Sequence, residues 1–294
     1  MAMNPKTLRP RKKASFHAEA LLWQTAVIAN GGTVSSGTMQ AVSNFCTSIV
    51  TAGIRSKFLR LNLVCGNNLA AARVPLYRGA SAAGTQYGSA ADTNIGPLTS
   101  GDYSEATGLQ GNGSTKALDC TITLGTFKTF GTDYDNVHLA VYNRSLSGVS
   151  GPSFGAYDQS GLYFSNALGI NSSSVAQYTS TGPDFISGSI TPGEHDLSAT
   201  SFARGFHLAE FTAAAAGFYG INGANVTGAI ANVYADPFDA TDATPLYFLG
   251  DFDTLSSQLL SAYSCGLPMT TAANRLAFAT AMTAFQTALG RNVT

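Results

Sequence analysis

The fold of this chain is decided by four short segments: FARGFHLAEF (202–211), AAGFYGINGANV (215–226), TPLYFLGDFD (244–253) and SQLLSAYSCG (257–266). Each is rich in aromatic and aliphatic residues and lies near turn-forming Gly, Pro, Asn or Asp, as β-strands do. Asn222-Gly223 tolerates positive φ at both central positions of a type I′ turn and so predicts a hairpin. The four segments predict an antiparallel sheet, and a helical pattern follows them up to Gly290.

Three segments nearer the N-terminus alternate with period two. They are residues 59–65, 120–124 and 137–141, and each pattern predicts a strand with one buried face. Residues 79–115 lie between the first two and are rich in Gly, Ser, Thr and Asn. A loop of that length inside a compact domain is usually functional or interfacial. We expect Leu61, Leu139, Phe248 and Tyr263 to face the core.

Helical patterns occur at both ends of the chain. Residues 17–53 predict two helices, and residues 271–290 predict a third. Ser35 or Ser36 can cap the second helix, and Thr270 or Thr271 the third. Trp23, the only tryptophan, flanks the first apolar stripe, and we expect it to serve packing. The predicted buried stripes are Ala18, Leu21, Leu22, Thr25, Ile28 and Ala29; Met39, Val42, Phe45, Cys46, Ile49 and Val50; and Phe278, Ala281, Met282, Phe285 and Leu289.

The chain has an unusually low proportion of charged residues. Of its 294 residues, 11% are charged, against about 25% in typical soluble domains. Hydroxyl and amide surfaces can contact neighbouring subunits without the cost of burying charges. This composition is typical of extracellular β proteins and virion components, and a single soluble lectin would share it.

The first 13 residues form a basic arm. It has five basic and no acidic side chains, and since the whole chain carries −1, the remaining 281 residues carry −6. The basic residues, our candidates for docking onto a partner, are Lys6, Arg9, Arg11, Lys12 and Lys13. No aromatic residue precedes Phe16 and no RNA-binding signature follows, so we favour a protein partner over nucleic acid. A solubilising terminus without a partner remains an alternative.

Targeting and cysteine patterns indicate where the chain folds. No run of 18 apolar residues indicates a transmembrane helix, and the polar residues after the basic arm interrupt any secretory signal. We therefore expect no membrane association, and folding in a cytoplasm. Cys46, Cys65, Cys120 and Cys265 are far apart in sequence and form no CxxC pair, so we expect free, buried thiols.

The sequence contains few candidate catalytic groups. Only four glutamates are present, without the alternating acidic strand of concanavalin A-like glycosidases, so a polysaccharide depolymerase is the weakest hypothesis. Asp251 and Asp253 are calcium candidates, as are Asp133 and Asp135, although Asp between strands most often forms turns. The histidines of the chain are scattered and do not have the spacing of a zinc site. We expect no enzymatic activity and no cofactor, with calcium left open.

Seven segments in this order resemble a family of tailed-bacteriophage and prophage structural proteins with a concanavalin A-like (laminin-G-like) jelly-roll domain. They are GGTVSSGTMQAVSNF (31–45), AGIRSKFLRLNLVCGNNLAAARVPLYRG (52–79), GLQGNGSTKALD (108–119), RGFHLAEF (204–211), GFYGINGANV (217–226), PLYFLG (245–250) and LLSAYSCGLPMTTAANRLAFATAMTAFQTALGRNV (259–293). The resemblance covers about residues 17–293. It implies a virion or tail-associated protein, but the family's motifs carry no functional residues to transfer.

We therefore expect a mainly β fold, a concanavalin A-like antiparallel β-sandwich with helices at both ends. The predicted parts are a basic arm (1–16), a helical segment packed on the body (17–54), the jelly roll (55–265) and a C-terminal helix (266–294). The expected function is that of a phage virion structural protein of the tail or an external appendage, such as a receptor-binding fibre. It would be made in the host cytoplasm and bind other virion proteins as a trimer or larger homo-oligomer.

The alternative is a soluble lectin-like protein, and a fibre that binds a host-surface glycan would combine both functions. Sugars stack on aromatic rings and exchange hydrogen bonds with amides. The predicted ligand-binding residues are Tyr87, Tyr103, Asn166 and Asn171. Since Tyr is also enriched at interfaces, the same residues would suit a subunit boundary.

Overall fold

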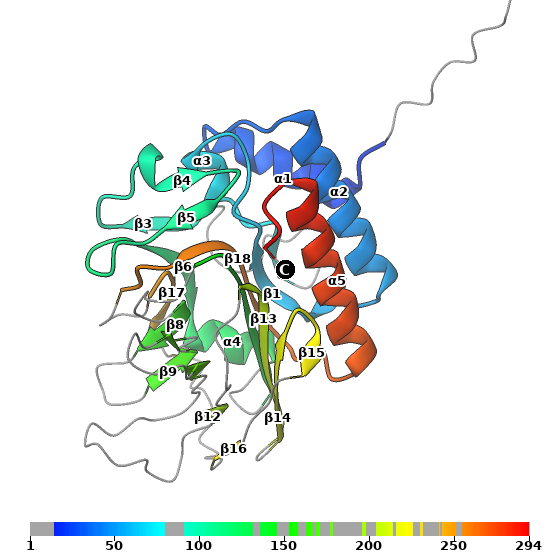
Figure 1. The fold of residues 1–294 in the computed structure, drawn as a ribbon, viewed down its shortest axis with the longest axis vertical. Coiled ribbons are helices and arrows are strands. Elements are labelled where there is room, and N and C mark those ends of the chain that lie inside the picture. Colours follow the sequence, from blue (N-terminus) through cyan, green and yellow to red (C-terminus); the bar gives the residue numbers. More distant parts are fainter. Residues whose placement is uncertain are drawn as a thin grey trace, which may run out of the picture.

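The computed structural model describes residues 15–79, 91–131, 136–145, 153–157, 163–166, 169–170, 177–178, 196–197, 204–213, 216–225, 230–231, 241, 243–250 and 255–293. The fold is mainly β, with two antiparallel sheets and a few helices, as the sequence predicted. The long helices gather on one side of the larger sheet, and the smaller sheet lies on the other (Figure 1).

Most described helices lie in the first 130 residues, and one follows the last strand. The α-helices are α1 (Ala18–Ala29), α2 (Ser36–Thr51), α3 (Leu69–Ala72), α4 (Leu124–Phe130) and α5 (Ala272–Ala288), and the 3-10 turns are η1 (Arg55–Lys57) and η2 (Ser100–Asp102). The N-caps expected from the sequence form, because Ser35 accepts a hydrogen bond from Thr38 N and Thr271 accepts one from Asn274 N.

The larger sheet has nine strands in the described part of the chain. In order they are β15 (Ala224–Asn225), β14 (Ala216–Ile221), β13 (Gly205–Ala213), β7 (Val137–Asn143), β18 (Leu259–Gly266), β1 (Phe58–Asn62) and β2 (Tyr77–Arg78), with β5 (Gly108–Gln110) on β18 and β4 (Tyr103–Ser104) on β5. The predicted hairpin joins β14 to β15. Ile221 pairs with Ala224 across Asn222 and Gly223, whose φ angles are 52° and 86°.

The smaller sheet has five described strands. They are β3 (Thr93–Ile95), β6 (Ala117–Thr123), β17 (Pro245–Phe248), β8 (Phe154–Tyr157) and β9 (Tyr163–Asn166), in that order. Two short pairs complete the described strands: β10 (Gly169–Ile170) with β11 (Gln177–Tyr178), and β12 (Asp196–Leu197) with β16 (Ile230–Ala231).

The central strands of the larger sheet are buried on both faces. Every residue of β1 and β7 is buried, whereas the sequence predicted one exposed face. Helices cover one face and the smaller sheet covers the other, so both sets of alternating side chains lie inside. Only β6, in the smaller sheet, shows the half-buried alternation that was predicted.

Strand β1 changes register at its start. The pairing with β18 shifts between Phe58 and Arg60. Leu59 therefore packs in the cluster between the two sheets, while Leu61, two residues later, packs in the cluster under the helices. A simple period of two does not predict this change of side.

Two further predictions need correction. The segment 79–115 is not one long loop, since β3, η2, β4 and β5 lie in its described part. Leu124 does not extend the strand of Cys120 and Ile122 but begins α4, because Thr123 caps a helix there through Thr126. The local hydroxyl cap therefore outweighs the period-two pattern.

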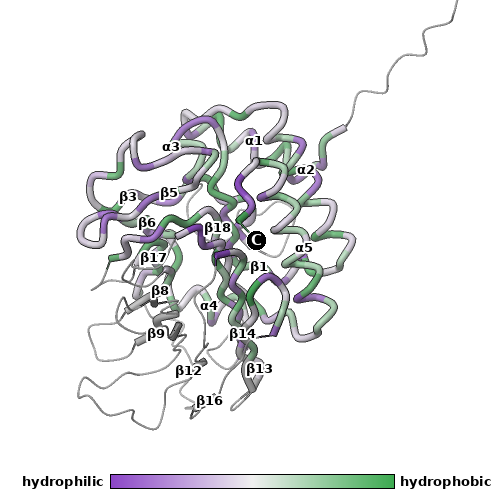
Figure 2. The backbone as a smooth tube through the Cα atoms, viewed as in Figure 1, coloured by the Kyte–Doolittle hydropathy of each residue, from purple (hydrophilic) through white to green (hydrophobic). Residues whose placement is uncertain are grey.

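The stripes of α2 and α5 are close to those predicted. Met39, Val42, Phe45, Cys46 and Ile49 are buried in α2, but Val50 is 47% exposed. In α5 the predicted residues are buried except Leu289, which is partly buried. Hydrophobic positions recur along both helices in Figure 2, and their buried residues form one cluster with residues of the larger sheet.

The four predicted core residues are all buried, with exposures of 0% or 1%. We expect Leu61→Ala to lower the free energy of unfolding by about 2–5 kcal/mol and Phe248→Ala by about 3–5 kcal/mol, because each leaves a cavity. Urea unfolding measures both losses. Leu276→Ala is the matched control, since Leu276 is 57% exposed and should change stability by under about 0.5 kcal/mol. Losses below that value at both core sites would contradict the described packing.

Candidate functional site

Helix α1 is apolar on two faces, and the structure buries the face that the sequence analysis did not choose. Ala20, Trp23 and Val27 are buried against the body. The indole Nε1 of Trp23 donates a hydrogen bond to the Val74 carbonyl at 3.0 Å, which confirms its packing role. Trp23 has the largest apolar surface in the helix, so burying its face stabilises the packing most. The i, i+3, i+7 spacing of 20, 23 and 27 was the available sequence signal.

The opposite face of α1, which we call the α1 outer face, is the candidate functional site. Leu21, Leu22 and Ile28 are 45%, 52% and 63% exposed. These three residues belong to the stripe that the sequence predicted to be buried. A helix that is hydrophobic on all sides is normally covered on all sides, and exposed apolar surface of this kind is typical of interaction sites. In sequence, the basic arm ends at Lys13, five residues before the helix begins.

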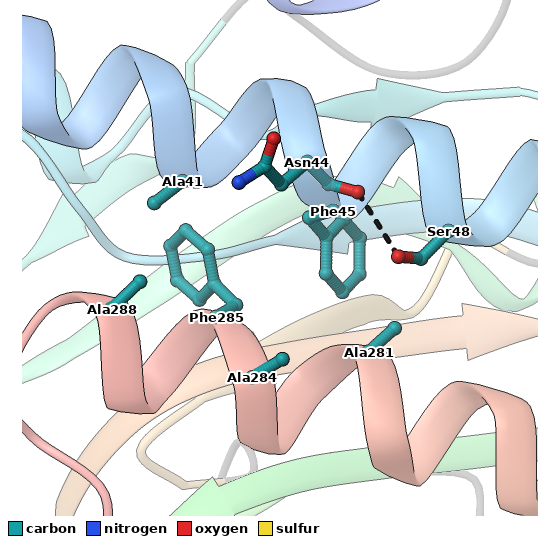
Figure 3. A pocket seen from close by; sticks show the side chains of 8 residues that line it. All are labelled: Ala41, Asn44, Phe45, Ser48, Ala281, Ala284, Phe285 and Ala288. Carbon is teal, nitrogen blue, oxygen red and sulfur yellow. Dashed lines mark hydrogen bonds between the residues drawn. The ribbon is translucent and has the colours of Figure 1, made fainter.

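A small groove separates α2 from α5 (Figure 3). Ala41 and Phe45 on α2 face Ala281, Phe285 and Ala288 on α5, and the two phenyl centroids lie 5.9 Å apart, edge to face. The groove holds about 70 Å³, well under the roughly 300 Å³ at which ligand pockets begin. We assign it to helix packing rather than to a ligand.

Helix α5 is fixed to the sheet by a buried carboxylate. Glu210 on β13 accepts hydrogen bonds from Arg275 Nε at 2.6 Å and from Met269 N at 2.7 Å. The Arg275 guanidinium also lies 4.2 Å from the Phe218 ring centroid. Burial raises the pKa of Glu210 above its ordinary value, and the Arg275 contact opposes that shift.

The chain end beyond α5 is held by Arg291, which is fully buried. Its guanidinium donates to the carbonyls of Leu63 at 2.6 Å, Val64 at 2.9 Å and Ser261 at 3.1 Å, and its Nε donates to Gln286 Oε1 at 2.5 Å. Carbonyl oxygens thus replace water around the cation, and they bring β1, β18 and α5 together. Burial lowers the pKa of Arg291.

A buried histidine lies where α5 meets the sheet. The Nδ1 of His138 is 2.8 Å from the Leu267 carbonyl, and its Nε2 is 3.1 Å from Ser264 Oγ. A carbonyl only accepts, so Nδ1 carries the proton and Nε2 accepts from the serine. The rings of Phe58 and Phe278 approach its edge. Burial lowers the pKa of His138 to about 4, so the ring is neutral at pH 7.

An ion pair lies between the two sheets. Arg60 on β1 donates from Nη2 to Asp92 Oδ1 at 2.6 Å, and both side chains are 0% exposed. Asn62 donates to Asp92 Oδ2 at 2.8 Å, and the Tyr263 hydroxyl lies 2.8 Å from both oxygens. Burial alone would lower the pKa of Arg60, but the Asp92 carboxylate holds it above its ordinary value.

The sequence analysis missed this cluster, which we call the Arg60–Asp92 cluster. The alternation over residues 59–65 predicted a strand with one buried face, and the two polar side chains Arg60 and Asn62 among the leucines were the available signal. Asp92 lies in the polar stretch 79–115, where no pattern distinguished it. Because the cluster is closed to solvent, we assign it a structural role.

Among the predicted ligand-binding residues, the structure describes the side chain of Tyr103, which is buried inside the protein. Tyr103 is 8% exposed, and its hydroxyl donates to the Gly66 carbonyl at 2.6 Å. Its ring is therefore not displayed for stacking on a sugar, because β4 and β5 fold the predicted loop against the body. Asn166 lies in β9, where its backbone pairs with Phe154. Tyr87 and Asn171 lie outside the described residues.

The remaining predicted sites are mostly beyond the described ranges. Those outside them are Lys6, Arg9, Arg11, Lys12, Lys13, Asp133, Asp135, Asp251 and Asp253. The cysteines Cys46, Cys65, Cys120 and Cys265 are free and buried, as predicted. No helix in the described ranges is both long enough and apolar enough to cross a membrane.

No family model matches the chain, and no curated protein matches it. Among solved structures, the chain is similar to a mutant of Trypanosoma rangeli sialidase displaying trans-sialidase activity. The sequence identity is 11%, the TM-score is 0.44, and the match covers 86% of this chain and 40% of that one. The chain is also similar to domain 4 of AbnA, a GH43 extracellular arabinanase from Geobacillus stearothermophilus. The sequence identity is 12%, the TM-score is 0.33, and the match covers 65% of this chain and 88% of that one.

The chain spans 27% of T. rangeli sialidase in its complex with 2,3-difluorosialic acid, at a TM-score of 0.33 and 12% identity. It thus covers well under half the length of the sialidases that it matches. TM-scores this low support no inference about activity or ligand.

We expect Arg60→Met to destabilise the fold by about 3–5 kcal/mol, because it leaves the Asp92 carboxylate buried without its cation. The matched control is Lys116→Met, which breaks the partly exposed Lys116–Asp102 pair and should cost at most about 1 kcal/mol. Urea unfolding of both variants measures the difference. Equal losses would show that Asp92 does not depend on Arg60.

The neutral His138 predicts a loss of stability in acid. Its folded pKa is about 4, below the ordinary 6.5, so the unfolded chain binds the proton first as the pH falls. The penalty is absent above pH 7, grows from about pH 6.5 and reaches roughly 3 kcal/mol at pH 4. We expect His138→Gln to lose less stability over this interval than the parent in urea unfolding. Identical pH profiles would contradict the assignment.

Proposed function

We propose that this chain is a phage virion structural protein of the tail or an external appendage, made in the host cytoplasm. We propose that its body is a concanavalin A-like jelly roll and that it acts by assembly, without catalysis. The motif resemblance across residues 17–293 and the low charge of the surface support this proposal. The observation that carries it is the α1 outer face.

The α1 outer face supports an assembly function because of what it would gain from a partner. Leu21, Leu22 and Ile28 project apolar side chains on the side of α1 away from Trp23. Burying apolar side chains at an interface releases free energy roughly in proportion to the area removed from water. Few charged groups on the chain would need to be desolvated at the same time.

We propose that the occupant is a second copy of this chain, within a homo-oligomer of three or more subunits. The arm carries five positive charges and the rest of the chain carries −6, so the arm of one copy and the body of another have complementary charge. In sequence, the arm ends five residues before α1 begins. Contacts with other virion proteins, and glycan binding by loops that include Tyr87 and Asn171, stay predictions.

We expect the double variant Leu22→Glu, Ile28→Glu to dissociate the oligomer, because it places like charges in an apolar interface. Sedimentation or light scattering gives the mass, and circular dichroism should be unchanged because both residues are exposed. Leu276→Glu is the matched control: Leu276 is 57% exposed but belongs to α5 and not to α1. This control should keep the parent mass.

The arm is tested in the same measurement. Deleting residues 1–13 should weaken association at low salt and matter less above about 0.15 M, where the Debye length is about 8 Å. A monomeric parent protein, or a double variant that assembles like the parent, would overturn the proposed second-copy interface. A parent that is monomeric alone but binds purified virion proteins through α1 would replace the occupant and keep the structural function.

A further inference from the structure

Three potential metal ligands converge where α1 begins. They are His17, Glu19 and Cys46, and one ligand atom from each lies within 4.8 Å of the other two. His17 and Glu19 lie at the first turn of α1, and Cys46 comes from the middle of α2. The His17 backbone N–H also donates to Ser43 Oγ at 2.8 Å, which holds the start of α1 against α2.

Only one of the two Glu19 carboxylate oxygens has a hydrogen-bond partner among the described residues. Its Oε1 accepts from Arg55 Nε at 2.6 Å. Its Oε2 is buried and has no hydrogen-bond partner among the residues that the structure describes, and the whole residue is 4% exposed. A buried carboxylate oxygen without a partner is costly. The ion pair with Arg55 therefore does not by itself account for this carboxylate.

We propose that His17, Glu19 and Cys46 form a zinc site that pins the first turn of α1 to α2. A nitrogen, a sulfur and an oxygen donor together suit Zn²⁺, whereas calcium and magnesium prefer oxygen alone. The fourth ligand is a water molecule. As the zinc–sulfur bond forms, the S–H bond of Cys46 breaks and its proton leaves to the buffer.

The geometry requires a small adjustment on binding. Tetrahedral zinc, with bonds of about 2.0–2.3 Å, holds its ligand atoms about 3.3–3.8 Å apart, so the present separations of up to 4.8 Å must close by roughly 1 Å. His17 is only partly buried and can move by that amount. Its Nδ1 gives up a long 3.3 Å contact with the Glu19 N–H, while Arg55 keeps Glu19 Oε1.

The site has a consequence for the helix that carries the α1 outer face. Zinc would cross-link two helices at the first turn of α1, and so fix the direction of α1. The inference does not depend on the proposed assembly, because metal binding is measured on the protein whatever its oligomeric state.

The test is titration of the chelator-treated full chain with Co²⁺, followed by Zn²⁺. We expect one equivalent of Co²⁺ to give the near-ultraviolet thiolate charge-transfer band and the visible bands of tetrahedral cobalt, and Zn²⁺ to displace them. Cys46→Ser should abolish the thiolate band. His17→Gln, at a partly exposed position, should weaken binding at least tenfold and keep the fold even if the cysteine variant does not.

Cys65→Ser is the matched control, because Cys65 is also buried but belongs to no such group of potential metal ligands within the described part of the chain. It should keep the band and the affinity of the parent. The absence of a thiolate band in the parent, or an undiminished affinity in His17→Gln, would overturn the proposal. So would a band that is lost in Cys65→Ser and kept in Cys46→Ser.

Discussion

The ion pair between Arg60 and Asp92 is the constraint on which the layered structure depends. It lies between the two sheets with no exposure to solvent, where an isolated charge would be very costly. Asn62 and Tyr263 supply further hydrogen bonds to the same carboxylate. The cluster therefore joins β1, β18 and the residue directly before β3, and it lies between the two sheets.

The need to give buried charges a partner also applies on the other side of the larger sheet. Helices cover it, and two buried charged groups there have specific partners: Glu210 accepts from Arg275 and the Met269 N–H, and Arg291 is surrounded by carbonyl oxygens. These contacts fix α5 firmly against the sheet. Helix α2 packs on α5, and α1 packs on α2 and α3.

Helix α1, with two apolar faces of which one is exposed, connects the fold to the proposed function. One face of α1 is buried in the core through Trp23 and Val27, and the other is exposed and can contact another subunit. The proposed zinc site at His17, Glu19 and Cys46 would set the angle of this helix without occupying its outer face. Metal binding and assembly would then be separate properties of one element.

The sequence by itself determined the features that depend on neighbouring residues. The Asn222-Gly223 turn, the caps at Ser35 and Thr271, and the strand around Phe248 formed as predicted, because backbone geometry and local hydrogen bonds decide them. For the function and for the binding sites in loops, the sequence supplied hypotheses. Those at Tyr87 and Asn171 stay predictions, while Tyr103 proved to be buried.

Only the tertiary structure decided which surfaces are covered. The sequence offered two apolar stripes on α1, and the contact of Trp23 with Val74 selected one. Nothing in the sequence indicated that Arg60 pairs with Asp92, which lies 32 residues further along the chain. Nor did the sequence indicate that Cys46 and His17 lie close together. Covering a face or pairing a charge depends on what distant segments bring to the same place, and the local pattern of residues contains no information about that meeting.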